Sequence, residues 1–553
     1  MRREFLSVLV LAALAGCPGS GAGIGDPCGG NDDCSGAAQC LNGRCVRRCE
    51  RAPECGDGYA CDHGACIAAQ FTQGDTCLSE VDCIAGLTCQ INGAEVDPIS
   101  NRLVSSCQKE NAMGRATGAA CDGDDDCRNG ACDLGHCVDV CHDTVDCPMG
   151  SSCMTIPRVS VGDKLYYGCL KSSGVIQWPI QVGSPSSQVL LPVPSTATSA
   201  ELVMMVDDPS QKVGASSVLD PCGCTRYAVP CEFQDNDPNC TPLRSRDQYY
   251  SQAPSADSNN VVGDNTICAP TVMCDDTPGV AVNRIRHLPE FGHSVLLIPS
   301  IPRNGELKQG TYQVQVQSYW PNNSHGSAIP HITAVVRIGE GDTLDLHFWF
   351  LDLTAHPCVQ MPDNAALSAA TARAPSPSPF RDDYFGTLHT LFGHLGIGVI
   401  DATYDDITNR HALDGLDIAD AGSLFPISRY PSGINIFFVR SLSPIGVEVF
   451  GPNPGPAFGG TPDSGIVVSL DSLCTRDWPS LARLTAHALG RYMGLYHNVE
   501  PRDPSQPAED PTWEDLIPDS DDASSNLMYP SAHDGTDLSN TQRNALIWSP
   551  VLR

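Results

Sequence analysis

Apolar and polar residues alternate along several segments between residues 176 and 340. The alternation is clearest in "TYQVQVQSYW" from Thr311, "HITAVVRIG" from His331 and "SVLLIPSIP" from Ser294. A period of two predicts strands that have one face in a core and the other in solvent. "AELVMMVDD" from Ala200 predicts a more continuously apolar strand. Together these segments predict an all-β domain over residues 176–340, of the β-sandwich or jelly-roll type.

After residue 342 the pattern combines strands with helical periodicity. "TLDLHFWFLDL" from Thr343 predicts a strand, and apolar residues recur at helical spacing in "RDDYFGTLHTLFGHLGIG". Further strands are predicted at "GVIDATYDDIT", "GINIFFVRSL" and "GIVVSLDS". A helix is then predicted from Pro479 to Gly494, with Asp477 as its N-cap. This order predicts an α/β domain over residues 343–553, in which one sheet packs against two helices.

The N-terminal part of the chain has few apolar residues and many cysteines. Residues 25–170 hold 20 of the 29 cysteines, in five groups of four that each begin C-x5-C. Such a repeat predicts small tandem modules that depend on disulfides, each contributing roughly 2–4 kcal/mol. The spacing resembles that of Dickkopf N-terminal or EGF-like modules. Zinc ligation by these cysteines is the weaker alternative, because exported cysteines are usually oxidised.

The first 17 residues are typical of an export signal rather than of a folded segment. Arg2 and Arg3 precede an apolar run from Phe5 to Leu14, which is too short to span a bilayer. The run leads into "LAGC", which ends at Cys17 and resembles a bacterial lipobox. The resemblance implies that Cys17 carries a lipid and anchors the protein to the cell envelope, with the outer membrane favoured over extracellular release. The alternative is an ordinary secretory signal whose cysteine is incidental.

Composition and charge exclude some classes of partner. With 553 residues the chain is too long for one core, which predicts a multidomain protein. The net charge of −32 argues against nucleic-acid partners and against adsorption to anionic lipid, because both need a positive surface. Acidic clusters at residues 32–33 and 124–126 make calcium possible in the N-terminal region, although solvated turn residues are the more common explanation.

The predicted helix near residue 487 carries the candidate chemistry. In "LTAHALGRYMGLYHNVEP" from Leu484, three positions match the zinc-protease motif H-E-x-x-H-x-x-G-x-x-H: His487, Gly494 and His497. Ala488 stands in place of the catalytic glutamate, and Arg491 stands in place of the middle histidine.

Residues 343–553 resemble the metzincin metalloproteases, and the pappalysin-like families most closely. The helix motif carries the resemblance together with "SSNLMYPS", in which Met528 looks like the methionine of the Met-turn beneath the zinc site. The resemblance implies an α/β metzincin-like domain. Cys358 and Cys474 are the two cysteines of this part of the chain. As a disulfide they would join the end of the first strand to the loop before the helix.

The two substitutions predict that zinc hydrolysis is lost. A guanidinium stays protonated, so Arg491 does not ligate zinc, and its charge repels the ion. Ala488 removes the general base, a loss that costs about 10²–10⁴-fold in rate. No catalytic residue and no cofactor are therefore expected, and His487 and His497 remain as candidate metal ligands. Zinc binding would need a replacement ligand or base, for which the candidates are Glu500, Asp503 and His533.

Two classes of function stay open. The first is a surface-anchored, non-catalytic protein that binds a protein or a peptide, with an extended peptide added along "GIVVSLDS". The second is a secreted zinc-dependent metalloprotease with an atypical active site. A structural envelope lipoprotein without a specific ligand is a third, plainer reading of the same sequence.

Overall fold

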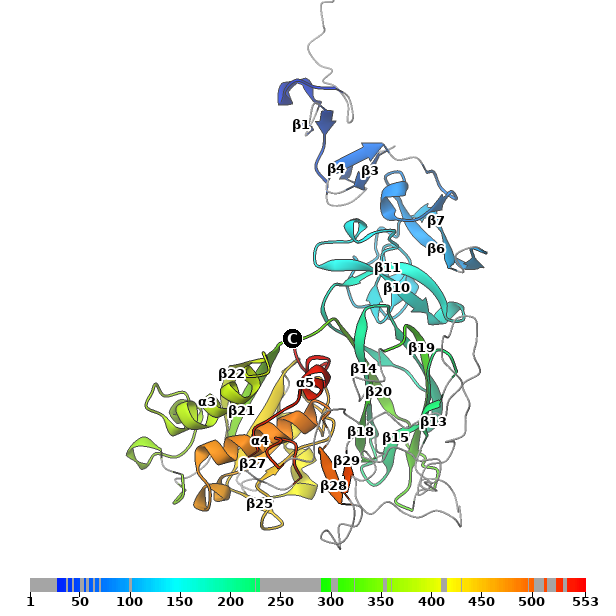
Figure 1. Cartoon of the computed structure of the whole chain (residues 1–553). Helices are drawn as coiled ribbons and strands as arrows, with labels where there is room; N and C mark the ends of the chain where they lie inside the picture. The colour runs from blue at the N-terminus through cyan, green and yellow to red at the C-terminus, as the bar shows by residue number, and fades with distance from the viewer. Residues whose placement is uncertain are drawn as a thin grey trace, which may run out of the picture.

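The structure is a computed structural model of the whole chain, in which three regions follow one another (Figure 1). It describes residues 27–35, 38–41, 44–49, 54–55, 59–62, 65–68, 71–98, 102–223, 225–228, 290–299, 307–322, 324–351, 356–359, 361–408, 415–428, 430–495, 497–501, 512–514, 524–530 and 535–553. The expected lipid-carrying Cys17 lies outside these residues, and so do the five cysteines between residues 224 and 274. The protein has several domains, and β-sheet predominates in them.

Short antiparallel hairpins build the N-terminal region. The strands are β1 (Gln39–Leu41), β2 (Arg44–Val46), β3 (Tyr59–Asp62), β4 (Ala65–Ala68), β5 (Thr76–Cys77), β6 (Leu87–Val96), β7 (Leu103–Lys109), β8 (Cys132–Asp133), β9 (His136–Cys137), β10 (Ser151–Arg158) and β11 (Lys164–Lys171). Where the structure describes the whole C-x5-C segment that begins a group, that segment includes one turn of 3₁₀ helix, as at Asn31–Asp33 and Asp124–Asp126. Such short strands have little apolar surface, so disulfides must supply much of the stability.

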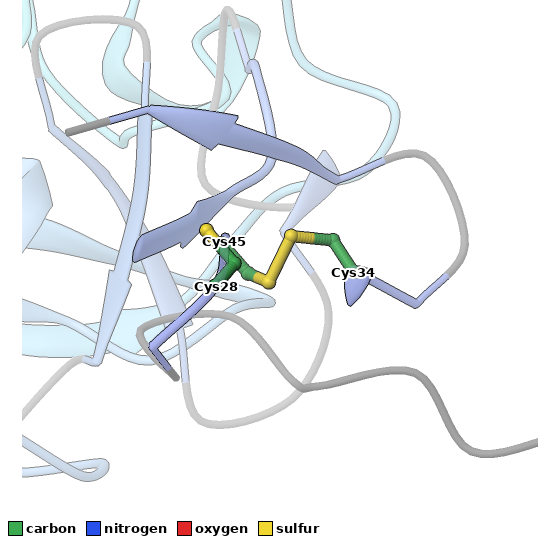
Figure 2. A group of neighbouring side chains, drawn as sticks. All are labelled: Cys28, Cys34 and Cys45. Atoms are coloured by element: carbon green, nitrogen blue, oxygen red, sulfur yellow. A yellow bond between two sulfur atoms is a disulfide. The ribbon is translucent and has the colours of Figure 1, made fainter. Parts of the chain in front are cut away.

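The disulfides of these modules follow one rule. In the first group Cys28 bonds Cys40, and Cys34 bonds Cys45, so the first cysteine pairs with the third and the second with the fourth. The groups that begin at residues 77, 121 and 141 repeat this pairing. Figure 2 shows Cys28, Cys34 and Cys45 gathered at one point. Their sulfurs lie within 4.8 Å of one another. All three belong to disulfides, however, so they are not the thiolates that zinc would need.

The middle region consists of two antiparallel sheets with a shared core. One sheet has the order β12 (Gly174–Ile180), β20 (His331–Ile338), β14 (Ala197–Met205), β18 (His293–Ile298). The other has the order β13 (Ser186–Val193), β19 (Gly310–Tyr319), β15 (Lys212–Leu219), β16 (Thr225–Ala228), and β17 (Glu290–Phe291) also pairs with β15. Alternate residues of both sheets, such as Leu202 and Val316, are fully buried between them.

Strand β14 explains the continuous apolar run that the sequence shows. Ala200, Leu202 and Met204 face the core of the sandwich. Glu201 and Val203 point to the opposite face, yet both are also buried, at 1% and 2% exposure. The C-terminal region covers that opposite face, as the neighbourhood of β14 and α5 in Figure 1 shows. Strand β14 is therefore buried on both sides, as parallel strands in α/β proteins are.

The C-terminal region is built on a five-stranded mixed sheet. Its order is β22 (Gly398–Ile407), β21 (Thr343–Leu351), β24 (Ile434–Val439), β27 (Ile466–Ser469), β26 (Val449–Phe450). The first four strands are parallel, and β26 runs antiparallel to β27 at one edge. Small two-stranded sheets lie outside it: β23 (Gly415–Asp417) with β25 (Ser441–Ser443), and β28 (Val499–Pro501) with β29 (Thr512–Glu514).

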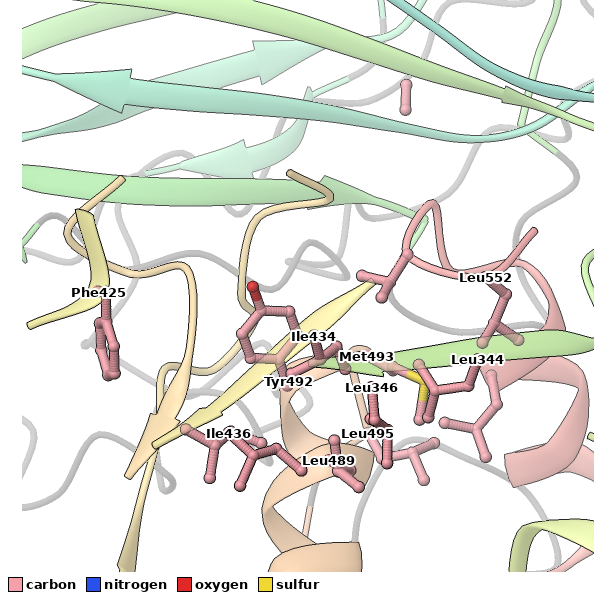
Figure 3. Packing of buried hydrophobic residues seen from close by; sticks show 14 of the residues in the cluster. Leu344, Leu346, Phe425, Ile434, Ile436, Leu489, Tyr492, Met493, Leu495 and Leu552 are labelled. Carbon is pink, nitrogen blue, oxygen red and sulfur yellow. The ribbon is translucent and has the colours of Figure 1, made fainter. Parts of the chain in front are cut away.

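Helices cover one face of this sheet. They are α2 (Ala369–Ala372), α3 (Gly386–Gly393), α4 (Trp478–Tyr492) and α5 (Asn540–Ile547). The first helical segment differs from a plain α-helix, because a π-helical turn over Pro379–Phe385 precedes α3. This turn places Phe380 against the sheet, with its ring edge-on to Phe348 of β21 at 5.4 Å between ring centroids. Figure 3 shows the same core around Leu346 of β21, Ile436 of β24 and Leu489 of α4.

Helix α4 lies where the sequence predicts it, but it ends earlier. It spans Trp478–Tyr492, whereas the predicted helix ran from Pro479 to Gly494. The Asp477 carboxylate accepts the N–H of Ser480 at 2.9 Å, which caps the first turn as expected. None of the helices in the described part of the chain has the length and apolar character that crossing a bilayer requires.

Candidate functional site

The end of helix α4 brings the two motif histidines together. Gly494 has φ of +108°, a left-handed conformation that disfavours side chains, and Leu495 donates its N–H back to the Gly490 carbonyl at 2.9 Å. The chain therefore reverses at Gly494, and His497 returns toward His487. Their Nε2 atoms lie 3.1 Å apart and their ring centroids 5.0 Å apart.

A backbone carbonyl fixes the ring of His487. Its Nδ1 donates to the carbonyl oxygen of Leu527 at 2.7 Å, and its Nε2 faces His497. When one ring nitrogen of a neutral histidine donates, the other has the lone pair that a metal would use. This carbonyl belongs to the backbone of a distant residue, so the side-chain pattern of the motif does not indicate it.

Arg491 occupies the place that a third ligand would take. It lies one helical turn after His487, and its Nη1 hydrogen-bonds to the Nε2 of His497. His497 is 8% exposed, so this contact is largely shielded from solvent. The guanidinium N–H is directed at the ring nitrogen that zinc would require as a lone-pair donor. The described residues at this point therefore do not fit a zinc ion.

Ala488 offers no base. It is partly buried and packs against the apolar core, next to the neighbouring Leu489, which is fully buried. The replacement ligands or bases considered from the sequence are not tested: Asp503 and His533 lie outside the described residues, and so does the side chain of Glu500. The apolar face of the helix thus packs in the core. Among the described residues beside His487 and His497 there is neither a carboxylate nor a third imidazole.

Met528 lies directly beneath the helix. It is fully buried, and a Cβ added at Gly490 would be 2.8 Å from its sulfur. Asn498 donates its N–H to the Met528 carbonyl at 3.1 Å, and the Asn526 side chain accepts the Met528 N–H at 2.8 Å. Only glycine at position 490 lets helix and turn approach this closely.

The pair Cys358 and Cys474 forms a disulfide, with 4.8 Å between the Cα atoms. Cys358 follows strand β21, and Cys474 ends the short 3₁₀ helix that precedes α4. Nearby, the Nε2 of buried His356 lies 2.8 Å from the Asp471 carboxylate. These contacts fix the start of α4 relative to the sheet.

Strand β27, proposed from the sequence as the place where a peptide would add, does not lie at the edge of the sheet. It pairs with β24 on one side and with β26 on the other, through Val467 and Val468. The two-residue strand β26 is the terminal strand of this sheet order. The expectation for "GIVVSLDS" is therefore wrong, because Val467 and Val468 at its centre already pair with a strand on each side.

The acidic clusters of the N-terminal region have partners within the chain. The Asp33 carboxylate accepts the N–H groups of Gly29 and Gly30, at 2.7 and 3.0 Å. Asp124 accepts the Cys132 N–H at 2.8 Å and forms an ion pair with buried Arg158. The carboxylates stabilise their own turns and the contact between neighbouring modules. Calcium binding there stays a prediction.

A cavity of about 530 Å³ lies away from the histidines, between α3 and the first turns of α4. Asp383, His394 and Arg483 are among the residues that line it. His487, Arg491 and His497 do not belong to its lining. The motif and the cavity are therefore separate features.

No protein-family model matches the chain. A turripeptide OL55-like protein from Lophiotoma acuta is 28% identical over 102 residues, which is 16% of this chain and 97% of that protein. The chain has a cysteine-rich N-terminal region with many disulfides, in agreement with this similarity. Such extensive disulfide bonding indicates an extracellular or secreted protein. Neither comparison assigns a family to the C-terminal domain.

Proposed function

We propose that the protein is an exported binding protein whose C-terminal domain has a metzincin-like fold without zinc-dependent activity. One observation carries this proposal: the guanidinium of Arg491 hydrogen-bonds to the Nε2 of His497, the atom that zinc would need. A permanent cation at this point opposes a dication by roughly 4 kcal/mol or more, taking unit charges near 4 Å and an intermediate dielectric.

Three features support the metzincin-like part of the proposal. In the main sheet, one strand, a helix and four further strands precede α4, and one strand of that sheet is antiparallel. His487 and His497 meet across the glycine turn. Met528 packs beneath the helix at Gly490. This combination of helix, glycine turn and buried methionine is what the resemblance of residues 343–553 implies.

The ligand we propose is a protein or an extended peptide. Strand β26 ends the sheet order, so a peptide would add beside Val449 and Phe450. Both side chains are half-buried. The site of addition proposed from the sequence thus moves by one strand. A lipid at Cys17 would present this domain at the surface of the cell envelope.

The alternative is a zinc protease with an atypical site, and one observation favours it. The Leu527 carbonyl orients His487 so that its Nε2 faces the Nε2 of His497, as a pair of metal ligands would be. This reading needs Arg491 to turn away from the site and a further ligand to enter.

The two proposals differ in peptide cleavage. The mature full-length chain would be incubated with a mixture of unstructured peptides, with and without equimolar zinc, and the products read by mass spectrometry. We expect the chain to bind some of the peptides and to cleave none of them. The double variant A488E/R491H restores the two missing motif residues and serves as the comparison. Cleavage by the unmodified chain, abolished by a chelator, would overturn the proposal.

A further inference from the structure

The sandwich and the C-terminal domain contact each other along one face of the sandwich. Val203 of β14, Leu297 of β18 and Val335 of β20 point away from the core of the sandwich, yet they are only 2%, 5% and 0% exposed. A Cβ added at Gly494 would lie 2.8 Å from Leu297, so the sandwich contacts the turn that ends α4. The interface therefore reaches the region around the motif histidines.

One segment of the C-terminal domain, residues 451–463, connects the sandwich with helix α4. The Tyr492 hydroxyl donates to the Pro456 carbonyl at 2.8 Å, and the Gly455 N–H donates to the Tyr492 carbonyl at 2.9 Å. On the sandwich side, the Nδ1 of His293 lies 2.5 Å from the Asp463 carboxylate. Separation of the two domains would therefore disturb the end of α4.

Glu201 is buried in the middle of this interface. It lies on β14 and is 1% exposed. Its Oε1 accepts the Ala457 N–H at 3.0 Å, and its Oε2 has no hydrogen-bond partner among the described residues. Burial with one oxygen unsatisfied disfavours the ionised carboxylate relative to the neutral acid. Burial accordingly raises the pKa of Glu201 to about 8, and the hydrogen bond from Ala457 lowers it only in part.

The charged groups around Glu201 do not offset this cost. On the C-terminal domain the neighbouring titratable groups are Asp463 and Tyr492 of α4; burial raises the pKa of Tyr492, with further increases from Glu201 and Asp463, so its phenol is neutral. On the sandwich, His293 of β18 pairs with Asp463. Arg337 of β20 hydrogen-bonds to the Leu552 carbonyl and donates to Gly339 at 3.2 Å. These bonds direct the side chains of His293 and Arg337 to other groups.

We infer that Glu201 is a pH-sensitive lock between the two domains: its neutral carboxyl group holds the sandwich against residues 451–463, and its ionisation loosens the interface. The acid is harder to ionise in the closed state than after separation, so the closed state binds more protons. The advantage of the closed state is complete below pH 4.5 and is lost as the pH rises from there to about 8. Across this window the ratio of open to closed forms rises roughly tenfold per pH unit. The inference does not depend on whether the motif binds zinc.

Hydrogen exchange at the Gly455 and Ala457 amides would test the lock in the full chain. Each amide is protected by a bond across or beside the interface. We expect the protection factor, corrected for the intrinsic exchange rate, to fall roughly tenfold per pH unit between pH 5 and 8. Glu201→Gln cannot ionise, so its protection factor should stay constant over the same range.

Three further variants complete the test. Glu340→Gln changes an exposed glutamate and should behave as the unmodified chain does. Glu201→Met provides a second neutral side chain if Glu201→Gln fails to fold. Methionine cannot accept the Ala457 N–H, so the protection factor would then be measured at the Gly455 amide. A constant protection factor in the unmodified chain would overturn the lock. The lock would also be overturned if the protection factor still fell with pH in Glu201→Gln but became constant in His293→Gln. That result would assign the pH dependence to the pair of His293 and Asp463.

Discussion

The Nδ1 of His487 and the carbonyl oxygen of Leu527 lie 2.7 Å apart, which ties helix α4 to the turn that includes Met528. This bond orients the imidazole without any metal, since the backbone supplies the acceptor. It also leaves the Nε2 of His487 facing His497. The frame of a two-histidine site is thus present, and the side chain of Arg491 decides what the frame can bind.

Replacing Arg491 by histidine should restore zinc binding. The variant removes a permanent charge and adds an imidazole one helical turn after His487. We expect at least about a hundred-fold tighter zinc binding than in the unmodified chain, because the repulsion removed is roughly 4 kcal/mol or more. Competition with a chromogenic chelator would measure it. Arg381→His, at an exposed position outside the motif, is the control, and equal affinities for both variants would contradict the prediction.

Gly490→Ala should weaken the contact between α4 and Met528. The added Cβ would meet a fully buried sulfur at 2.8 Å, and overpacking typically costs 1–3 kcal/mol. Alanine regains up to about 1 kcal/mol in helix propensity, so a net loss of about 1 kcal/mol is expected. Gly393→Ala in α3 has open space around its Cβ and should be neutral or stabilising. The denaturant midpoint of each variant would be compared with that of the unmodified chain. Equal shifts for the two variants would contradict the close contact at Gly490.

Removal of the Cys358–Cys474 disulfide should destabilise the C-terminal domain strongly. The bond closes a loop of 116 residues, for which the chain-entropy estimate is about 4–5 kcal/mol. The double serine variant would be followed by chemical denaturation. A double serine variant of Cys28 and Cys40, which are 12 residues apart in an N-terminal module, is the control. It should leave the C-terminal unfolding midpoint unchanged, and a loss below about 1 kcal/mol in the first variant would count against the prediction.

His347 should make the C-terminal domain sensitive to acid. The ring is buried, stacks on Tyr430 with 3.9 Å between centroids, and its Nε2 lies 3.0 Å from the Ser432 carbonyl. Burial lowers the pKa of His347. The unfolded chain therefore binds the proton more readily, so stability is complete above pH 6.5 and falls as the pH drops below it. Unfolding midpoints at pH 5 and 8 should differ less in His347→Asn than in the unmodified chain. His394→Asn, at an exposed position, should retain the full difference.

Much of the layout could be predicted from residue patterns, because periodicity reports which face of an element is buried. The strand from Thr343 and the helix capped by Asp477 are examples. The continuous burial of β14 could be anticipated from "AELVMMVDD", but not what covers its second face. A glutamate within that apolar run, Glu201, indicates a buried polar group that needs a partner. Its partner Ala457 lies 256 residues away, and such contacts have no local pattern.

Pairing between distant residues was the part that the sequence could not determine. Four cysteines permit three connectivities, and spacing alone does not select the alternating one that the modules adopt. The edge of the C-terminal sheet was misplaced for a related reason. Strand β26 has only two residues, too few for an alternation to be recognised, and it takes the edge position beside β27.

The zinc content of the mature full-length chain tests the central claim most directly. The protein would be exposed to equimolar zinc, freed of unbound metal by gel filtration, and read by elemental analysis. The account predicts almost no zinc, because Arg491 bonds to the ring nitrogen of His497 that the metal would need. One tightly held zinc per chain, lost when His487 is replaced by alanine, would contradict it.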